Sequence, residues 1–180
     1  MRGRNFPEPG SKPRLFFALW PSDSIREELN STKSVFGLQQ AIWTKKENLH
    51  ITLAFLGSVE AARIPNMFEA ISSIDRKTFE ITIDSALQPS KSNMLWLTPK
   101  QTPYELTRLV ADLWKQLRSC GFSPDQKCFF PHVTLARSTC DQLMIQEISP
   151  ICWPIYSFYL VESLSDRFGS RYTAWESWDL

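Results

Sequence analysis

The sequence predicts an α+β fold, because strands and helices are expected in uneven blocks rather than in the regular alternation of a parallel sheet. The expected order along the 180 residues is strand, helix, strands, helix, strands, helix, strands. A second observation is the repeated pattern His-x-Thr-Leu-Ala, which begins at His50 and again at His132. The elements should divide near residue 90 into two halves with one copy each. Because these are the only histidines in the chain, the repeat indicates one site built from two matching segments.

The N-terminal part predicts a buried strand followed by a helix. Residues 14–20 (Arg-Leu-Phe-Phe-Ala-Leu-Trp) are almost wholly apolar, and short aromatic-rich runs of this kind are typical of buried strands. Ser24 and Glu27 have the spacing of a capping box, which predicts a helix over 22–36.

The first His-x-Thr copy lies in an expected strand. Residues 41–43 predict a short strand, and residues 49–56 predict a longer one that ends at Gly57. An amphipathic helix should follow, because its apolar residues recur at i, i+3, i+4 and i+7: Ile64, Met67, Phe68 and Ile71.

The middle of the chain predicts two paired strands and the most clearly marked helix. Residues 79–83 alternate apolar and polar side chains, and residues 94–97 predict a partner strand. Residues 102–105 (Thr-Pro-Tyr-Glu) predict a helix start with Thr as N-cap, Pro at the first helical position and Glu at the third. Gly121 predicts the end of that helix.

The C-terminal part predicts three more strands. Residues 128–137 contain the second His-x-Thr copy, and residues 155–164 and 172–180 are the other two candidates. Residues 140–154 show no clear period. Gly169 supplies any positive φ in the turn before the last strand.

Composition limits the kind of partner. The formal net charge of +1 argues against a protein that coats nucleic acid through bulk charge, while a small phosphate site stays open. No apolar run approaches the roughly 20 residues that span a bilayer, so no membrane contact is expected. Residues 1–13 are polar and predict a flexible tail, and residues 14–180 predict a single domain.

The cysteines predict reduced thiols in a cytoplasmic protein, since none forms a Cys-x-x-Cys pair. A metal site is the competing interpretation, with His132 between two of them and His50 as a fourth ligand. That spacing fits no familiar zinc pattern, so no metal site is predicted. The four cysteines all lie in the last third: Cys120, Cys128, Cys140 and Cys152.

The repeated pattern has a direct chemical meaning. Residues i and i+2 of a strand point to the same face, so His50 and Thr52 share one face, as do His132 and Thr134. If the two strands lie side by side, two imidazoles and two hydroxyls converge. Imidazoles with a pKa of about 6.5 can act together as acid and base, and hydroxyls can donate hydrogen bonds to a phosphate.

Other side chains extend this candidate site. The guanidinium of Arg137, three residues past Thr134, can pair with a phosphate or stack on a base. Phe17 and Phe55 lie in the strands expected to line a shared cleft and are candidates for stacking on a nucleobase. Phosphodiester cleavage needs such a set: a base for water, an acid for the departing oxygen, and donors for the charge on phosphorus.

Together these motifs resemble the 2H phosphoesterase superfamily. The segments Arg-Leu-Phe-Phe-Ala, His-Ile-Thr-Leu-Ala-Phe-Leu-Gly and Phe-Pro-His-Val-Thr-Leu-Ala-Arg, with Arg171-Tyr172-Thr173, are most similar to its RNA 2′,3′-cyclic phosphodiesterase branch, also called 2′-5′ RNA ligase-like. The resemblance implies a bilobal fold of two antiparallel sheets, related by a pseudo-twofold, with outer helices and a central cleft.

The resemblance also implies an activity and its residues. The expected reaction is hydrolysis of a 2′,3′-cyclic phosphate on an RNA 3′ end or a nucleotide to a 2′-phosphomonoester, with neither metal nor other cofactor. His50 would be the acid and His132 the base, although the near symmetry leaves the two roles open. Thr52, Thr134 and Arg137 would bind phosphate. Because the first copy has Phe55 where the second has Arg137, we also expect the base to be held between Arg137 and Phe55.

Three other functions stay open at this point. The same histidines can join tRNA halves through a 2′-5′ bond, or open a cyclic phosphate on a small nucleotide such as an ADP-ribose derivative. A non-catalytic module that binds RNA ends is the third, although binding alone does not need two proton shuttles. The chain is expected to be a cytoplasmic monomer.

Overall fold

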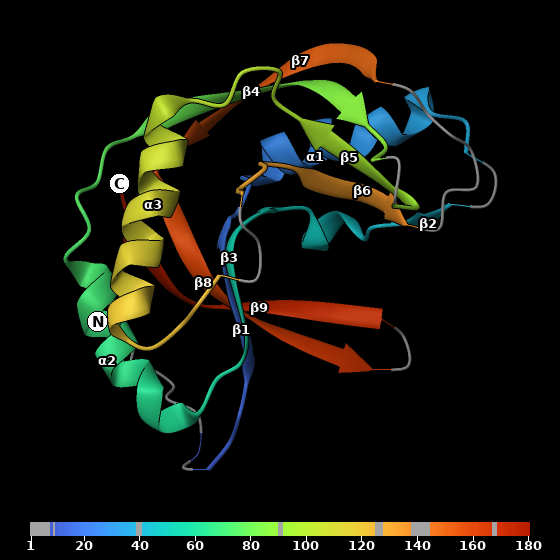
Figure 1. Cartoon of the computed structure of the whole chain (residues 1–180). Helices are drawn as coiled ribbons and strands as arrows, with labels where there is room; N and C mark the ends of the chain where they lie inside the picture. The colour runs from blue at the N-terminus through green and yellow to red at the C-terminus, as the bar shows by residue number, and fades with distance from the viewer. Residues whose placement is uncertain are drawn as a thin grey trace.

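The computed structural model describes residues 8, 10–38, 41–89, 92–124, 128–137, 145–166 and 169–180. It contains helices and antiparallel strands, as predicted (Figure 1). The helices are α1 (Asp23–Ser31), α2 (Ile64–Ser72) and α3 (Tyr104–Ser119). The strands are β1 (Arg14–Leu19), β2 (Ile42–Trp43), β3 (Ile51–Ser58), β4 (Phe79–Leu87), β5 (Met94–Thr98), β6 (Val133–Arg137), β7 (Gln146–Ile155), β8 (Ser157–Asp166) and β9 (Gly169–Asp179).

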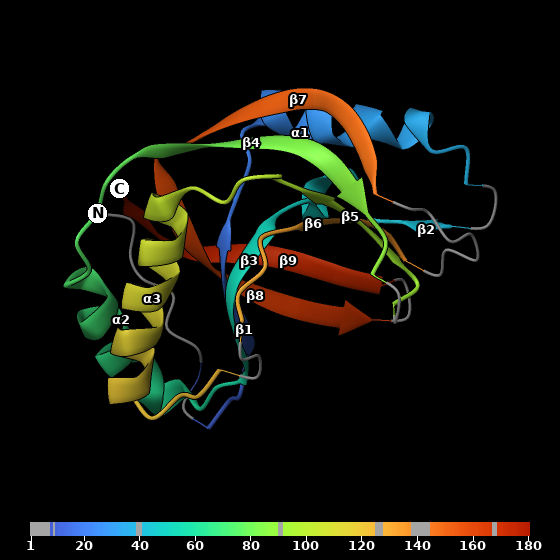
Figure 2. The same ribbon diagram turned by 45° about the horizontal axis from the view of Figure 1, so that its top comes forward.

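The strands form one curled sheet in the order β7-β4-β5-β6-β3-β1-β8-β9, with β2 paired to β6. Its two parts are joined at a single position, because β3 and β6 pair only through Ile51 and Val133. We call β7, β4, β5, β6 and β2 the β4 group, and β3, β1, β8 and β9 the β1 group. Away from the joining pair the two groups diverge, and β5, β6 and β2 lie apart from the β8–β9 hairpin (Figures 1 and 2).

The expected division of the chain near residue 90 is wrong. β4, which precedes that position, pairs with β5 and β7 in the group that contains the second histidine. The chain then returns, and β8 pairs with β1 of the other group. Unpaired strand edges are costly, so later segments add to strands formed earlier in the chain and the two sequence halves interleave.

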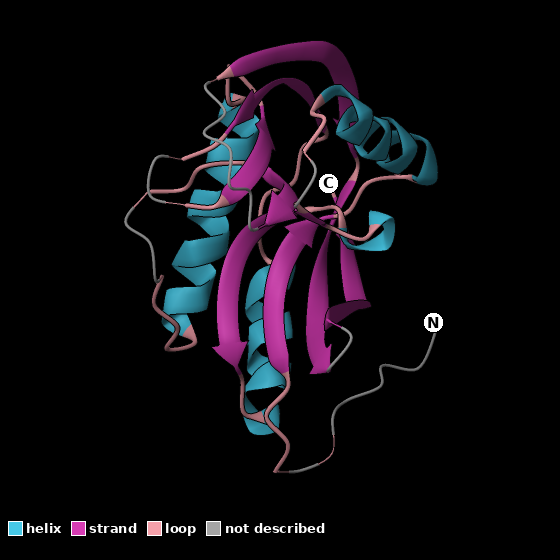
Figure 3. Ribbon diagram, turned by 90° about the vertical axis from the view of Figure 1, so that its right-hand side faces the viewer, coloured by secondary structure: helices cyan, strands magenta, loops and turns pink. Residues whose placement is uncertain are grey.

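The helices surround the strands rather than separating them (Figure 3). α2 and α3 contact each other, α3 contacts β3, and α1 contacts β7. The apolar face of α3 is buried as its spacing predicts, and α3 ends in a Schellman motif at Gly121, whose φ is 79°. There the Phe122 amide donates to the Leu117 carbonyl and the Gly121 amide to the Arg118 carbonyl.

Both predicted N-caps are displaced. The cap of α1 is Ser22, whose hydroxyl accepts a hydrogen bond from the Ile25 amide at 3.4 Å, so the capping box predicted at Ser24 is wrong. Ser22 follows Pro21 in extended backbone, which is the conformation that an N-cap needs. In α3 the N-cap is Pro103 rather than the preceding threonine, because Pro103 has an extended ψ of 141°.

Three strands, β7, β6 and β3, differ from expectation. β7 was not predicted, although it lies within residues 140–154 and the residue that follows. Its two prolines, Pro150 and Pro154, interrupt the alternation that would indicate a strand. A sheet tolerates proline at an edge, and β7 pairs with β4 alone. β6 begins at Val133, so it is shorter than residues 128–137. Gly57 lies within β3 at a φ of 68° instead of ending it.

The central strand β1 is buried on both faces. Leu15, Phe17 and Leu19 pack into the main core, whereas Phe16 and Ala18 pack with Val161 in a smaller cluster on the opposite face. This explains the nearly continuous apolar run, since a strand covered on both sides has no polar face. Each buried aromatic or aliphatic side chain contributes about 1.5–3 kcal/mol to the free energy of folding.

Candidate active site

The two histidines lie at the joint between the two strand groups. His50 directly precedes β3 and His132 directly precedes β6, next to the Ile51–Val133 pair. Because β3 and β6 are antiparallel, this one pair brings the starts of both strands together. Both histidines line a cavity of about 810 Å³, together with Thr52 and Thr134.

His50 is held by two hydrogen bonds. Its Nδ1 lies 2.6 Å from the Asn48 carbonyl oxygen and its Nε2 lies 3.0 Å from the Thr52 hydroxyl oxygen. A carbonyl only accepts, so Nδ1 carries the proton of the neutral ring and Nε2 accepts from the hydroxyl. Trp20 stacks on the ring with centroids 5.6 Å apart, and Tyr172 meets it edge-on at 5.2 Å.

His132 has a matching environment. Its Nδ1 lies 2.8 Å from the carbonyl oxygen of Phe130, which assigns the same tautomer. Trp96 stacks on the ring with centroids 4.0 Å apart and an interplanar angle of 24°. Both imidazoles therefore have Nε2 as the atom able to exchange a proton with a bound molecule.

Both imidazoles favour the neutral form. The pKa of His50 is lowered to about 4, chiefly by burial; the Asn48 carbonyl opposes this effect, and the positive charges of His132 and Arg137 add to it. Burial also lowers the pKa of His132, opposed by the Phe130 carbonyl. A bound anion would oppose these effects, because negative charge stabilises an imidazolium.

The described lining of the cavity carries cations and no carboxylate. Arg14, Lys45 and Arg137 line it, and none of them forms an ion pair with a described residue. The chain as a whole has a formal net charge of only +1, whereas the described lining of the cavity has these three cations and no carboxylate. The cavity is thus suited to an anion rather than to a cationic or metal ligand.

The competing interpretation, a metal site, involves four residues, of which the structure describes three. No group of three His, Cys, Asp or Glu side chains able to hold a metal ion occurs in the described part of the chain. Cys140 lies outside the described residues. Cys120, Cys128 and Cys152 are free thiols.

One predicted stacking residue is on the wrong side of its strand. Phe17 is fully buried in the main core, where it packs against Phe158 and Trp178, so the expectation that it lines the cleft is wrong. Phe16 lines the cavity instead and lies 5.0 Å from the His50 ring. Adjacent strand residues point to opposite faces, and the apolar run did not reveal which face was which.

The other predicted side chains line the cavity, but two of them lie far apart. Phe55 pairs with Phe16 in the β1 group, and Arg137 pairs with Met94 in the β4 group. From the joining pair the antiparallel strands run in opposite directions, and each residue lies four positions, about 13 Å, along its own strand. The expectation that a base is held between Phe55 and Arg137 is therefore wrong.

Several residues that surround the histidines were not predicted as site residues. Trp20 and Trp96 stack on them, and Asn48 accepts from one of them. Arg14 and Tyr172 line the cavity. The stacking of the tryptophans depends on strand pairing, which leaves no local signal, whereas the position of Asn48 two residues before His50 was visible in the sequence.

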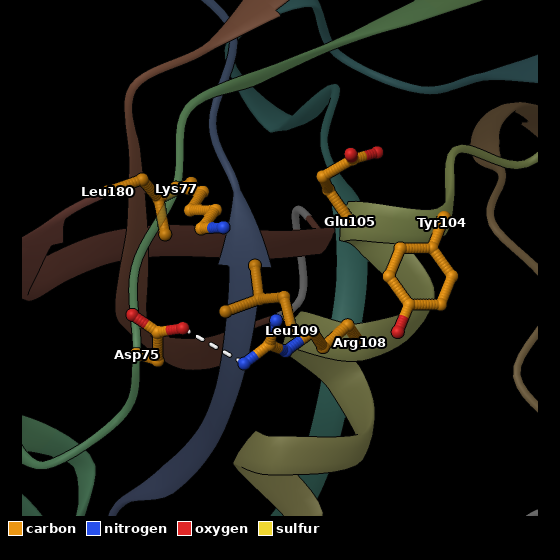
Figure 4. Close-up of a pocket in the computed structure, with 7 residues that line it drawn as sticks. All are labelled: Asp75, Lys77, Tyr104, Glu105, Arg108, Leu109 and Leu180. Atoms are coloured by element: carbon orange, nitrogen blue, oxygen red, sulfur yellow. Dashed lines mark hydrogen bonds and ion pairs between the residues drawn. The ribbon is translucent and has the colours of Figure 1, made fainter.

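A second pocket lacks the chemistry of the first. It lies at the start of α3, has a volume of about 60 Å³, and contains an ion pair of 2.9 Å between Asp75 and Arg108 (Figure 4). No histidine lines it. Figure 4 shows Lys77 and Glu105 at its rim, an ordinary mixed-charge surface.

Comparison with known proteins gives a consistent result. Residues 19–96 match the family described as LigT like Phosphoesterase. An RNA 2′,3′-cyclic phosphodiesterase of Escherichia coli (strain K12) is 31% identical over 169 residues, which cover 93% of this chain and 96% of that protein. A protein of the same name from Archaeoglobus fulgidus is 34% identical over 128 residues, covering 69% of this chain and 72% of the relative.

The fold is similar to that of a solved relative. The crystal structure of E. coli LigT complexed with 3′-AMP superimposes with a TM-score of 0.86 at 30% identity, covering 94% of this chain and 98% of that chain. The similarity in sequence and in fold thus extends over nearly the whole length of both proteins. The predicted family is confirmed: the chain belongs to the LigT-like phosphoesterases.

Proposed function

We propose that this protein hydrolyses 2′,3′-cyclic phosphates at RNA 3′ ends to 2′-phosphomonoesters. The observation that carries the proposal is the meeting of two imidazoles, each with Nε2 as its exchangeable position, in a cavity that has cations and no described carboxylate. The names of the relatives support the same reaction. The LigT complex with 3′-AMP supports a nucleotide as the bound group.

The proposed step needs one neutral and one protonated imidazole. Nε2 of the neutral ring takes a proton from water, whose oxygen forms a bond to phosphorus. The bond from phosphorus to O3′ breaks, and O3′ takes the proton from Nε2 of the other ring. The phosphate remains on O2′. Thr52, Thr134 and Arg137 would hold the charge that spreads over the phosphoryl oxygens.

We assign the acid role to His50 and the base role to His132. His50 has a pKa of about 4, so it is neutral near pH 7 in the free enzyme. The negative charge of the bound cyclic phosphate would raise that pKa, so that His50 takes up a proton from solvent before it acts as the acid. Nε2 of His132 forms no hydrogen bond with another described residue, which leaves its lone pair available to water.

We further propose that the β1 and β4 groups are related by a pseudo-twofold through the Ile51–Val133 pair. Three equivalent features support it: each histidine precedes a strand, each Nδ1 contacts the carbonyl two residues earlier, and each ring has a stacked tryptophan. Ligation of tRNA halves would use the same step with a 5′-hydroxyl in place of water, and it stays an alternative. The monomeric state and the cytoplasmic location stay predictions.

The test is the fate of a defined cyclic phosphate in excess chelator. We expect ³¹P NMR to show adenosine 2′,3′-cyclic phosphate converted to the 2′-phosphate, with activity lost in His50→Ala and in His132→Ala. Formation of the 3′-phosphate would contradict the assigned leaving oxygen. Tight binding of RNA ends without turnover in the wild type would favour a binding module, and joined RNA halves would favour ligation.

A further inference from the structure

The cavity continues beyond the two histidines in opposite directions. β3 and β6 leave the Ile51–Val133 pair antiparallel to each other, so residues beyond each histidine lie on opposite sides of the reaction centre. One side, which we call the Arg137 arm, is lined by Arg137, Ile42 and Met94. The other, the Arg14 arm, is lined by Arg14, Phe55 and Ser163.

The cavity is large for a small-ligand site. Cavities for drug-sized ligands measure roughly 300–1,000 Å³, and this cavity of about 810 Å³ lies in the upper part of that range. The reacting phosphate occupies the centre between the histidines. If the terminal nucleotide extends into one arm, the other arm is available for a second group of the same substrate.

The Arg14 arm contains an exposed guanidinium that can bind an anion. The Cζ atom of Arg14 lies 4.9 Å from the centre of the Phe55 ring. The side chain is exposed and forms no ion pair with a described residue. A guanidinium that lies against an aromatic face is held in place while its N–H donors at the edge stay free for phosphate oxygens.

The neighbouring lysine provides a contrast. Lys12 lies two residues earlier and forms an ion pair of 3.0 Å with Glu60. It does not line the cavity. Of these two neighbouring cations, the one that faces the cavity is therefore the one without an anionic partner among the described residues, which is the pattern expected when the substrate supplies it.

We propose that the Arg14 arm binds the nucleotide immediately 5′ to the one that carries the cyclic phosphate. Arg14 pairs with the phosphodiester that connects the two nucleotides, and Phe55 orients Arg14 and offers an apolar contact to the second nucleotide. The preferred substrate is then an RNA end of at least two nucleotides rather than a free cyclic mononucleotide. This inference rests on the proposed function, with the terminal nucleotide in the Arg137 arm.

The test compares two substrates and two matched variants. The substrates are adenosine 2′,3′-cyclic phosphate and the dinucleotide ApA with a 2′,3′-cyclic phosphate at its 3′ end. For the wild type we expect kcat/KM to be at least about tenfold higher on the dinucleotide, as for one charge-assisted hydrogen bond. Arg14→Gln should remove that gain and leave the mononucleotide rate within about twofold. Lys12→Gln, which removes the same charge nearby, should leave the gain intact.

Each other outcome has a defined meaning. Equal loss on both substrates in Arg14→Gln would show that this arm holds the terminal nucleotide, which overturns the inference but not the proposed function. An unchanged dinucleotide gain would also overturn it. Failure of the wild type to hydrolyse either substrate would refute the proposed function itself. Phe55→Leu, which preserves an apolar side chain, should reduce the dinucleotide gain in part, and thermal unfolding of all variants checks their folding.

Discussion

The backbone carbonyl of Asn48 accepts the Nδ1 proton of His50 over 2.6 Å. The side chain of the same asparagine is almost fully buried, and its amide donates to the carbonyl oxygen of Ser170 at 2.8 Å. Ser170 belongs to β9, so Asn48 connects the β8–β9 hairpin to the tautomer and orientation of a candidate catalytic ring.

Replacement of Asn48 should weaken both the fold and the reaction. Asn48→Ala removes the donor to Ser170, and the loss of a buried hydrogen bond should lower the free energy of unfolding by about 1–3 kcal/mol. Asn48→Asp should be at least as harmful, since a carboxylate cannot donate to a carbonyl. Urea unfolding and kcat measure the two effects. A stable Asn48→Asp variant with wild-type kcat would contradict the role of this contact.

Removal of either histidine should reduce kcat by about 10²- to 10⁴-fold, because each supplies one proton transfer. The double variant should be little worse than either single variant, since the two rings act as a unit. Steady-state kinetics in chelator measures this. Additive losses would instead indicate that the histidines act independently.

The activity of the free enzyme should be greatest on the acidic side of pH 6.5. The pKa values of both histidines are lowered. The pH range in which one ring is protonated and the other neutral should therefore lie below the ordinary imidazole pKa. kcat/KM should therefore fall as pH rises and the remaining imidazolium loses its proton. Bound phosphate raises these pKa values, so the optimum of kcat should lie at higher pH than that of kcat/KM. Profiles from pH 4 to 9 test both statements.

The stability of the fold should also depend on His50. Its pKa is lower in the folded state, at about 4, than the value near 6.5 expected in the unfolded chain. The unfolded chain binds more protons between these values, so stability is lost as pH falls from about 6.5 to about 4. His50→Gln should lose less stability than the wild type over this window. Parallel urea titrations at each pH measure the difference; identical slopes would contradict it.

The stacked Trp96 should raise the pKa of His132 and so oppose the effect of burial, because the face of an indole ring attracts an imidazolium. Trp96→Leu keeps an apolar cover but lacks the aromatic face, so the pKa of His132 should fall by about half a unit or more. The two histidines give two resolvable NMR titrations. Trp43→Leu, at a cavity residue with no ring contact to a described histidine, is the control.

Local patterns explain why much of the fold was predictable. The alternation in β4 and the apolar face of α3 depend only on neighbours in sequence, and both segments form as expected. β7 was missed because its prolines break the strand pattern, and only its place at the sheet edge makes them tolerable. The N-cap of α1 was misplaced because Ser22 and Ser24 are equally suitable in sequence, and backbone geometry selects the first.

By itself the sequence determined the chemistry of each half of the site. His50 with Thr52, and His132 with Thr134, share a strand face because side chains alternate with a period of two. Tertiary structure decided that the halves meet at the Ile51–Val133 pair, that Phe16 rather than Phe17 faces the cavity, and that the Arg14 and Arg137 arms point apart. The physical reason is strand register, which is set by hydrogen bonds between segments distant in sequence. In a continuous apolar strand such as β1, the sequence also does not show which side chains point to which face.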